Sequence, residues 1–515
     1  MQNTGESEAK QLDLLSPLRH SLKGRKGVHM LTVTVQLSTG RRYQRIEHFG
    51  ASGAWSIDPI GKEWTEANKN ALADLLFSRE KGIGLSLWRF NIGAGGALTD
   101  QLWDPWRGAE VFKASEEAEY DWSKHAGQQW FLRAAKKRGV ERFLACVYSP
   151  PVWMTKNGHA HCDKQSGSTN LKPGYERHFA RFLTDVLEHF AKEGLPFHSI
   201  SPVNEPNWEW EGGQEGCRYN NEDLKRVIHA LYDEIRSRKL RTEIVVPEAG
   251  DLVSLLDDEF YRRWARMEDP RAAYTHGNRS KGWGMYGQYI RELLGDAEIR
   301  RKVGNRLCAH SYWTDSSLHL LRDLRRTVRE NIDRYAPGAQ YWQTEYCVME
   351  HHRDLGMDTA LRVARVIHYD LTAASASAWH WWLAVSPYDY KDGLIYTDYR
   401  HTGQQNILPS KTLWTLGNFS RFIRPGATRV HAEPSEVEEE LLVSAYVQAR
   451  SPRLICVVVH RGEKEALLRL ESDRNVEEWT PFITSAEHDL ARQPAVKASR
   501  ELLIPPRSVV TLTAL

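Results

Sequence analysis

Apolar residues recur in short β-branched or aromatic runs, most of them followed by amphipathic stretches with helical spacing. The runs predict eight strands, at 49–55, 85–91, 143–149, 199–204, 244–248, 307–312, 341–346 and 376–383. The amphipathic stretches predict helices that include 63–81, 128–138, 175–193, 222–238, 318–335, 358–374 and, after the last strand, 411–423. This alternation is typical of an α/β protein.

The number of repeats favours a (β/α)8 barrel over residues 47–424. A doubly wound open sheet is the main alternative, and it usually carries a glycine-rich phosphate turn after its first strand. Here Gly50-Ala-Ser-Gly53 is followed by Ala-Trp-Ser, without a third spaced glycine. The nucleotide-binding fingerprint is therefore missing, and we expect the barrel.

The pattern changes after Pro425, where strand-like segments follow one another with no helix between them. They predict a β-sandwich side domain over 425–515. Its expected strands are 427–433, 441–448, 454–460, 466–470, 478–483, 501–504 and 508–513. The alternating run at 31–37 has no helical partner, so we expect residues 30–46 to supply the first strand of this domain. The side domain would then be built from both chain ends.

Residues 1–29 are polar and read as a disordered extension without the apolar segment of a signal peptide. We therefore expect a cytoplasmic protein, unless the mature start differs. The 69 Lys and Arg residues nearly balance the 67 Asp and Glu residues, giving a net charge of +2. This balance gives no reason to expect nucleic acid or an anionic membrane as partner, and the sequence leaves the oligomeric state open.

Tryptophan is unusually frequent, with 19 residues beside 20 tyrosines. Some belong to the core, but the surplus near predicted strand ends suggests a flat ligand such as a sugar ring. The six cysteines include no CxxC pair, which argues against a zinc site. His159-Ala-His161-Cys162 lacks a matched partner elsewhere, so we expect no metal there.

Two glutamates stand at the carboxyl ends of strands that face each other across the predicted barrel. Glu205 follows the fourth strand, and Glu345 lies in the seventh. Catalytic groups of such barrels sit at this end, and glycoside hydrolysis needs two carboxyl groups that flank the scissile bond. Asn204, just before Glu205, can bind a sugar hydroxyl or the nucleophile. The pair predicts a glycosidase.

Other residues at strand ends complete the predicted cleft. Arg89 and Tyr312 can keep Glu345 ionised through charge and hydrogen bonding. The expected substrate-binding residues are Arg89, Trp153, Asn204, His310, Tyr312 and Trp381.

For several neighbours the sequence leaves two interpretations open. Glu248 either contacts substrate or satisfies a nearby arginine. Trp55, Trp208, Trp210 and Trp382 either contact substrate or pack in the core. Three acidic residues lie on the loop after the fourth strand, Glu209, Glu211 and Glu215; most of them are expected in solvent, and one could bind a sugar hydroxyl.

Cys162 and Cys217 lie on the loops after the third and fourth strands, which are neighbours in a barrel. We expect the two sulfur atoms to be close together, which would bring the two loops together over the cleft. The sequence leaves open whether they form a disulfide or remain thiols, although a reducing cytosol would favour thiols.

Four motifs resemble glycoside hydrolase family 30, as does the two-ended side domain. They are Phe49-Gly-Ala-Ser-Gly-Ala-Trp55, Ser149-Pro-Pro-Val-Trp-Met154, Ser201-Pro-Val-Asn-Glu-Pro206 and Trp342-Gln-Thr-Glu-Tyr-Cys347. The resemblance implies a retaining enzyme with Glu205 as acid/base and Glu345 as nucleophile, and no cofactor or metal. The loop 207–217 further resembles the endo-β-1,6-galactanase branch.

We therefore expect a retaining hydrolase that cleaves β-1,6-galactan or its oligosaccharides. Xylan and β-1,6-glucan are the alternative substrates, and the family's xylanases recognise a glucuronic acid branch, for which no basic residues can be identified here. A carbohydrate-binding protein without catalysis is the alternative from another class. It would require the loss of Glu205 or Glu345, and both are present.

Overall fold

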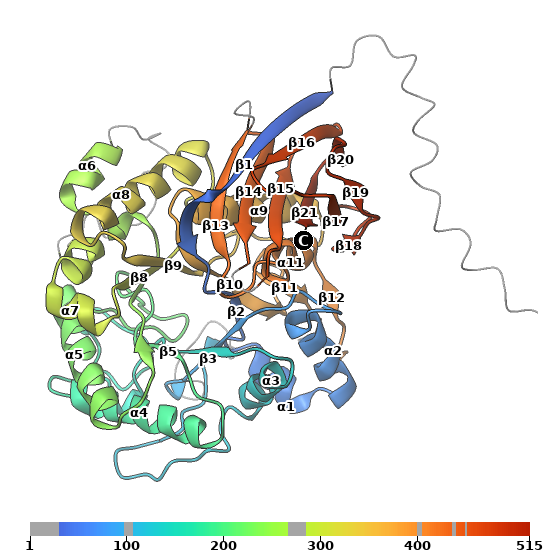
Figure 1. The fold of residues 1–515 in the computed structure, drawn as a ribbon. Coiled ribbons are helices and arrows are strands. Elements are labelled where there is room, and N and C mark those ends of the chain that lie inside the picture. Colours follow the sequence, from blue (N-terminus) through green and yellow to red (C-terminus); the bar gives the residue numbers. More distant parts are fainter. Residues whose placement is uncertain are drawn as a thin grey trace, which may run out of the picture.

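The computed structural model describes residues 30–96, 107–265, 285–398, 404–434, 439–448 and 451–514. The predicted extension at 1–29 lies outside the described residues. The described chain forms two sheets, one surrounded by helices and one made almost wholly from the carboxyl-terminal part of the sequence (Figure 1). The α/β fold class with an all-β side domain, predicted from the sequence, is confirmed.

The first sheet consists of parallel strands in the order β6-β5-β4-β3-β2-β10-β9-β8-β7. Because β6 (Glu243–Ile244) and β7 (Pro247–Ala249) are consecutive halves of one strand, this order closes into an eight-stranded barrel. The other strands are β2 (His48–Ser52), β3 (Leu87–Asn91), β4 (Arg142–Cys146), β5 (Ser199–Ser201), β8 (Arg306–His310), β9 (Gln340–Glu345) and β10 (Ala376–Ser386). Two short strands, β11 (Gly393–Tyr396) and β12 (Leu408–Pro409), extend the sheet beyond β10.

Amphipathic helices cover the outside of the barrel. They are α1 (Ile57–Glu63), α2 (Glu66–Phe77), α3 (Ala126–Lys137), α4 (Glu176–Lys192), α5 (Asn221–Ser237), α6 (Asp258–Ala265), α7 (Ala297–Lys302), α8 (Arg325–Tyr335), α9 (Met357–Thr372) and α11 (Lys411–Ser420). Single turns of other helix types occur at η4 (Val152–Met154), η5 (Val253–Leu255), η7 (Ile290–Leu294) and η8 (His319–Leu324).

The helix expected at 63–81 is α2, which is shorter and begins later because the chain is extended at Trp64 and Thr65; the separate helix α1 ends just before it. The Thr65 side chain accepts a hydrogen bond from Asn68 N and so begins α2. Neither α6 nor α7 was expected from the sequence. Both are short, with eight and six residues, so neither offers the several helical turns of apolar periodicity on which the expectation relied.

The second sheet follows the order β18-β17-β21-β15-β14-β13-β1-β16-β20, with β19 pairing with β17. The amino-terminal β1 (Leu31–Arg45) lies between antiparallel β13 (Thr428–Pro434) and parallel β16 (Ala466–Ser472). It continues well beyond 31–37, with register shifts between Ser38 and Arg45. The remaining strands are β14 (Leu441–Val447), β15 (Leu454–His460), β17 (Glu478–Thr484), β18 (Ala491–Arg492), β19 (Val496–Lys497), β20 (Leu502–Ile504) and β21 (Ser508–Ala514).

The second sheet has an apolar core of its own and is also packed on the barrel. Alternation along β15 shows how: Cys456 and Val458 belong to the core of the side domain, whereas Val457 and Val459 belong to the barrel core. The barrel-facing side packs on α9 and α11, which lie next to these strands in Figure 1. Two-sided burial therefore fixes the side domain to the barrel.

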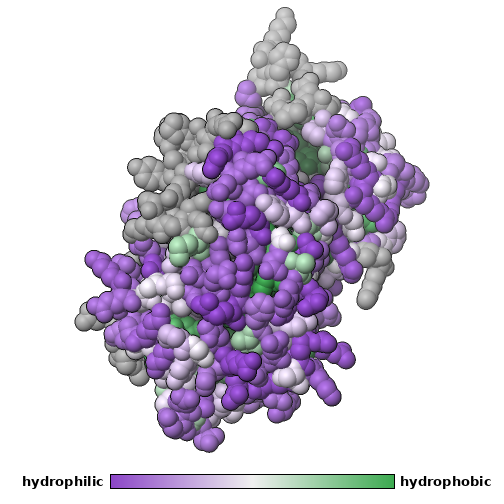
Figure 2. Space-filling view, turned by 90° about the vertical axis from the view of Figure 1, so that its left-hand side faces the viewer, coloured by the Kyte–Doolittle hydropathy of each residue, from purple (hydrophilic) through white to green (hydrophobic). Residues whose placement is uncertain are grey.

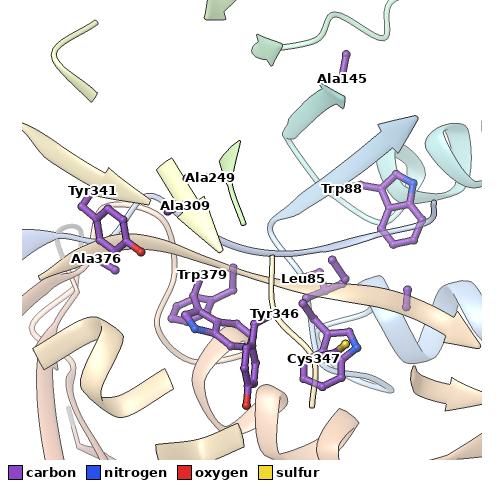
Figure 3. Packing of buried hydrophobic residues seen from close by; sticks show 14 of the residues in the cluster. Leu85, Trp88, Ala145, Ala249, Ala309, Tyr341, Tyr346, Cys347, Ala376 and Trp379 are labelled. Carbon is purple, nitrogen blue, oxygen red and sulfur yellow. The ribbon is translucent and has the colours of Figure 1, made fainter. Parts of the chain in front are cut away.

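Strands β9 and β10 carry large aromatic residues into the layer between the barrel and its helices. The rings of Tyr346 and Trp379 lie 6.2 Å apart, and Figure 3 shows them side by side. The Trp379 indole donates to Asp370, which also pairs with the buried Arg325. This packing fixes the strand that ends at Glu345.

Among the residues that the structure describes, no helix combines the length and the apolar character needed to cross a bilayer. The face in Figure 2 is largely hydrophilic, and apolar residues appear there only as small separate spots.

Candidate active site

Glu205 and Glu345 come together at the carboxyl end of the barrel. Glu345 is the last residue of β9, and Glu205 follows β5 in a left-handed backbone conformation with φ of 44°. One carboxylate oxygen of each residue and a ring nitrogen of His310 all lie within 4.8 Å of one another. His310 Nδ1 is 2.8 Å from Glu205 Oε1 and 3.6 Å from Glu345 Oε1. The two carboxyl groups thus face the same small space.

Glu345 is held by a cation and a hydroxyl. Arg89 Nη1, on β3 and fully buried, lies 2.5 Å from Glu345 Oε2, and its Nη2 donates to Asn204 Oδ1 at 3.1 Å. The Tyr312 hydroxyl donates to Glu345 Oε1 at 3.0 Å. Burial raises the pKa of Glu345, whereas the positive charges of His310 and Arg89 act in the opposite direction.

A third carboxylate, Glu248, lies behind the first two and is fully buried. Its oxygens accept hydrogen bonds from Ser201, from Thr344 at 2.5 Å and from His310 Nε2 at 2.9 Å, and Arg89 is 3.7 Å away. Burial alone would raise the pKa of Glu248, but Arg89, His310 and Ser201 lower it below its usual range. Glu248 therefore remains ionised and satisfies the nearby cations.

Glu248 also fixes the backbone of the acid/base candidate. Its carbonyl accepts a hydrogen bond from Glu205 N at 2.8 Å. Both residues have positive φ, 57° at Glu248 and 44° at Glu205. Such a conformation is costly for a residue with a side chain and persists only where its surroundings hold it. The strained backbone of strand β7 and that of the loop after β5 are thus hydrogen-bonded to each other directly.

His310 links the carboxylates from the centre of this network. Burial lowers its pKa, but Glu345, Glu205 and Glu248 outweigh that effect and raise the pKa to about 10. The ring is therefore protonated at neutral pH. Glu205, His310 and Glu345 could by distance alone hold a metal ion. A protonated His310 and the adjacent Arg89 make this a poor environment for a further cation, because metal ligation needs a neutral imidazole.

A cavity of about 850 Å³ opens above the two glutamates. Trp208 and Trp313 stack along one side, with ring centroids 6.3 Å apart and planes 21° apart. Trp208 is 37 % exposed and Met349 is 40 % exposed, so both offer apolar surface to a ligand. The described lining residues carry six carboxyl groups and one guanidinium, that of Arg107. The cleft is therefore aromatic and strongly acidic.

Four of the six predicted substrate-binding residues are brought to the two glutamates: Arg89, Asn204, His310 and Tyr312. Of these, Asn204 and Tyr312 line the cavity itself. Arg89 and His310 contact the glutamates from within the barrel, where both are fully buried.

The structure does not bring Trp153 or Trp381 to the cavity. The Trp153 indole N–H donates to Lys113 O at 2.9 Å. Trp381 is fully buried and donates to the carbonyls of Leu383 and Asp392. Because successive strand residues point to opposite faces, the neighbouring Trp382 lines the cavity instead.

For the tryptophans whose role the sequence left open, the structure separates those that line the cavity from the one that packs behind it. Trp208, Trp210 and Trp382 line the cavity, whereas Trp55 is 5 % exposed and packs behind Trp382. Glu209 and Glu211 line the cavity too. Glu215 differs from the expectation of solvent exposure: it is fully buried and accepts a backbone hydrogen bond from Ala109 N at 2.9 Å. Loop packing, which the charge of the residue does not reveal, explains the difference.

Cys162 and Cys217 are in contact, as predicted. Both are buried free thiols, and each acts on the pKa of the other, as neighbouring groups do. The backbones of Cys162 and Glu211 also form an isolated β-bridge, so the two loops meet beside the cleft. His161 Nδ1 bonds the carbonyl of Cys162, and His159 stacks on His161 at 5.2 Å. The His-x-His-Cys segment is therefore a loop contact in this structure.

Several cavity residues were not singled out in the sequence, namely Arg107, Tyr148, Trp313, Cys347, Met349, Tyr388 and Asp392. Most follow a barrel strand by only a few residues. Their position after a strand was the available signal, but it does not say which loop residues turn inward.

Comparison with known proteins agrees with this geometry. The model of O-glycosyl hydrolase family 30 matches residues 32–396. An endo-β-1,6-galactanase of Hypocrea rufa is 29 % identical over 226 residues, which cover 38 % of this chain and 44 % of that protein. An exo-β-1,6-galactobiohydrolase of Bifidobacterium longum is 22 % identical over 313 residues, 56 % of this chain and 19 % of that protein. The alignments thus span less than half the length of these two relatives.

Among solved structures, a conserved exported protein of Bacteroides fragilis superimposes with a TM-score of 0.81 at 30 % identity. That match covers 93 % of this chain and 100 % of the other. The family model covers well over half of the chain and includes both glutamates. The chain belongs to O-glycosyl hydrolase family 30.

Proposed function

We propose that the protein is a retaining glycoside hydrolase that cleaves β-linked galactan by double displacement. The observation that carries the proposal is the separation of Glu205 and Glu345, whose nearest oxygens lie within 4.8 Å. Retaining enzymes place the two carboxyl groups about 5–5.5 Å apart, whereas inverting enzymes need about 6.5–9.5 Å to admit a water molecule. The gap here suits direct attack on the sugar.

In the first step, Glu345 attacks the anomeric carbon while Glu205 gives its proton to the leaving oxygen. The glycosidic bond breaks and a glycosyl ester forms on Glu345. In the second step, Glu205 takes a proton from water, whose oxygen attacks the anomeric carbon and releases Glu345. Arg89 and Tyr312 contact both oxygens of Glu345 and favour its ionised form.

The surroundings of the three carboxyl groups support this division of roles. Glu248 is held ionised by its hydrogen bonds and by Arg89. Arg89, at 2.5 Å, and His310 oppose the rise in the pKa of Glu345 that burial causes. Glu205 contacts His310 at 2.8 Å and lines the cavity, where a leaving oxygen can reach it.

The acidic cleft supports a neutral glycan. A substrate with uronic acid branches would bring negative charge toward a cavity whose described lining residues carry six carboxyl groups and one guanidinium, that of Arg107; of the six, only Glu205 and Glu345 also contact His310 or Arg89 among the pairs at the catalytic centre. Two relatives carry names that refer to β-1,6-galactan, and this similarity supports galactan as the substrate. Neutral xylan and β-1,6-glucan meet the same charge condition and remain the alternative substrates. The aromatic lining suits the flat faces of sugar rings in any of them.

The first test is product analysis on β-1,6-galactan, xylan and β-1,6-glucan side by side, with NMR of the first-formed anomer. We expect release from galactan with retained configuration. Glu345→Gln should abolish turnover, because an amide is a far poorer nucleophile. Glu205→Ala should slow substrates with poor leaving groups most and activated aryl glycosides least. An inverted product, or full kcat in folded Glu345→Gln, would refute the mechanism; sugar binding without release would favour a binding protein.

A further inference from the structure

Glu205 lies where the loop after β5 meets the end of strand β7. Its backbone N–H donates to the carbonyl of Glu248 at 2.8 Å, and its own carbonyl accepts the indole N–H of Trp210 at 3.0 Å. A second bond joins the same two segments, because Gly250 N donates to the side-chain oxygen Oδ1 of Asn207 at 3.1 Å. The backbone of Glu205 is therefore fixed at its N–H and its carbonyl, and the two segments are tied together again beside it.

The Asn207 side chain is itself held by a buried polar cluster. Its Nδ2 donates to Ser254 Oγ at 3.0 Å and to Asp251 Oδ2 at 3.3 Å, and Ser254 N donates to Asp251 Oδ1 at 2.8 Å. These three side chains are at most 2 % exposed. Both N–H groups and the oxygen of the Asn207 amide thus have partners within the protein. Neither Asn207 nor Gly250 belongs to the described lining of the cavity, so their contacts lie behind Glu205.

Gly250 approaches the Glu205 carboxyl group so closely that a side chain has little room. A Cβ atom at this position would lie 3.1 Å from Cδ, 3.2 Å from Oε1 and 3.4 Å from Cγ of Glu205, which are its three nearest atoms outside the local chain. The φ angle of Gly250 lies outside the left-handed region, so its backbone does not require glycine. The glycine is therefore explained by the Glu205 side chain and not by a turn.

The two carboxylate oxygens of Glu205 have different surroundings. Oε1 lies beside Gly250 and 2.8 Å from His310 Nδ1. His310 Nε2 is 2.9 Å from a carboxylate oxygen of Glu248, so each ring nitrogen faces an acceptor and donates to it. Oε2 has no hydrogen-bond partner among the described residues, yet it is not one of the unpaired atoms that the protein encloses. Because Glu205 lines the cavity, Oε2 is the oxygen open to a ligand.

We propose that Gly250 and Asn207 are positioning residues for proton transfer: Asn207 holds the Gly250 backbone against the Glu205 carboxyl group, so that Oε1 stays on His310 and Oε2 meets the leaving oxygen. The proton on Oε2 passes to that oxygen as the glycosidic bond breaks, and Oε2 later takes a proton from the attacking water. Such transfer needs the two heavy atoms about 2.6–3.2 Å apart, so a small displacement matters. This proposal rests on the proposed function.

Gly250→Ala tests the close approach, because its methyl group would meet Glu205 first. The assay measures kcat/KM on aryl glycosides of the sugar that product analysis releases, with leaving groups of graded acidity. We expect less than a threefold loss on dinitrophenyl glycosides, which need no proton, and about a 10- to 100-fold loss on phenyl glycosides. Azide should accelerate the variant but not the wild type and give a glycosyl azide, because it attacks the glycosyl ester without a base. Equal losses across the series without an azide effect would overturn the proposal.

Asn207→Ala removes the acceptor of Gly250 N and should show the same dependence on the leaving group. Ser254→Ala is its matched control, because it removes a partner of Asn207 Nδ2 and leaves the bond to Gly250 in place. The control should lower the thermal midpoint of unfolding but keep the leaving-group dependence of the wild type. If both variants lose stability and neither changes that dependence, Asn207 supports the fold only and its part in the proposal is wrong.

Two reference variants separate the possible outcomes. Gly417→Ala on α11 adds the same methyl group in a packed position, 2.9 Å from side-chain atoms of Ile83 and Leu490, and should leave the leaving-group series unchanged. Glu205→Ala should show the full dependence and the strongest azide effect. If Glu205→Ala shows neither, the proposed function fails at its acid step, and the positioning role fails with it. If Glu205→Ala shows both and Gly250→Ala neither, only the positioning role is refuted.

Discussion

Replacing Glu248 with glutamine tests whether the third carboxylate sets the protonation of the catalytic groups. The change keeps the size of the side chain and removes one negative charge from between Arg89 and His310. His310 would lose an ionised partner that lies 2.9 Å from Nε2. Without this negative charge, His310 and Glu345 each bind a proton less tightly. The pKa values of both groups should therefore fall.

The size of the effect follows from that one contact. A hydrogen bond to a charged group contributes about 1.5–3 kcal/mol, and 1.36 kcal/mol corresponds to one pKa unit, so the pKa of His310 should fall by about one to two units. Starting from about 10, it would reach about 8 to 9 in the variant. Removing one partner from a buried ion cluster should also lower the free energy of unfolding by about 3 kcal/mol.

The sign of the pH dependence is fixed by the direction of the shift. The folded pKa of His310 lies above its ordinary 6.5. Protonated His310 therefore stabilises the fold fully below about pH 6.5, and this contribution is lost as the pH rises toward about 10. In Glu248→Gln the stabilisation by protonated His310 should be lost completely by about pH 8 to 9.

The assay combines imidazole NMR titration of His310, urea unfolding at several pH values and the pH profile of kcat/KM. We expect the whole profile to move toward acid pH. Glu243→Gln is the matched control, because Glu243 lies in the same split strand but its side chain is 55 % exposed and pairs with Arg306. A variant with reduced kcat but an unmoved profile and an unmoved His310 titration would refute the reasoning and leave Glu248 a purely structural role.

Two other substitutions test the surroundings of the glutamates. Tyr312→Phe removes the hydroxyl that donates to Glu345 at 3.0 Å, so kcat/KM should fall about tenfold and its acidic limb should move to higher pH, measured as a pH profile. An unmoved limb would show that Tyr312 does not stabilise the ionised nucleophile. Trp208→Ala should raise KM for polymeric substrate several-fold while leaving an aryl monosaccharide unaffected, since Trp208 lies beside Glu205; equal effects on both would contradict a leaving-group platform.

The barrel and the glutamate pair could be predicted from the sequence because each depends on a local pattern. Short apolar runs followed by amphipathic stretches identify the strands, and polar residues at their carboxyl ends mark the mouth of the barrel. Glu205 and Glu345 stand at such ends, so topology alone brings them together. The place of 31–37 in the side domain followed from its lack of a helical partner, whereas its pairing with β13 and β16 and its extension to Arg45 were not predicted.

The orientation of single side chains could not be predicted in the same way. Trp381 and Trp382 are chemically identical neighbours, and only the register of β10, which shifts relative to β2 between Trp381 and Leu383, decides which one faces the cavity. Asp392 and Arg107 lie on loops without periodicity, so nothing in the sequence directs them inward. The burial of Glu215 depends on backbone N–H groups of a distant loop. These features arise from packing between segments far apart in the chain.

The cluster around Glu248 shows why a buried charge network persists where an apolar core would be simpler. Arg89, His310 and three carboxyl groups are buried together, and replacing such a network with apolar residues is often neutral or stabilising in other proteins. Here the arrangement places Glu205 and Glu345 on one shared partner, His310. The proposed retaining mechanism needs two carboxyl groups in one small space, because one attacks the sugar while the other protonates the leaving group and later accepts a proton from water. The buried charges are therefore better explained by the proposed reaction than by stability.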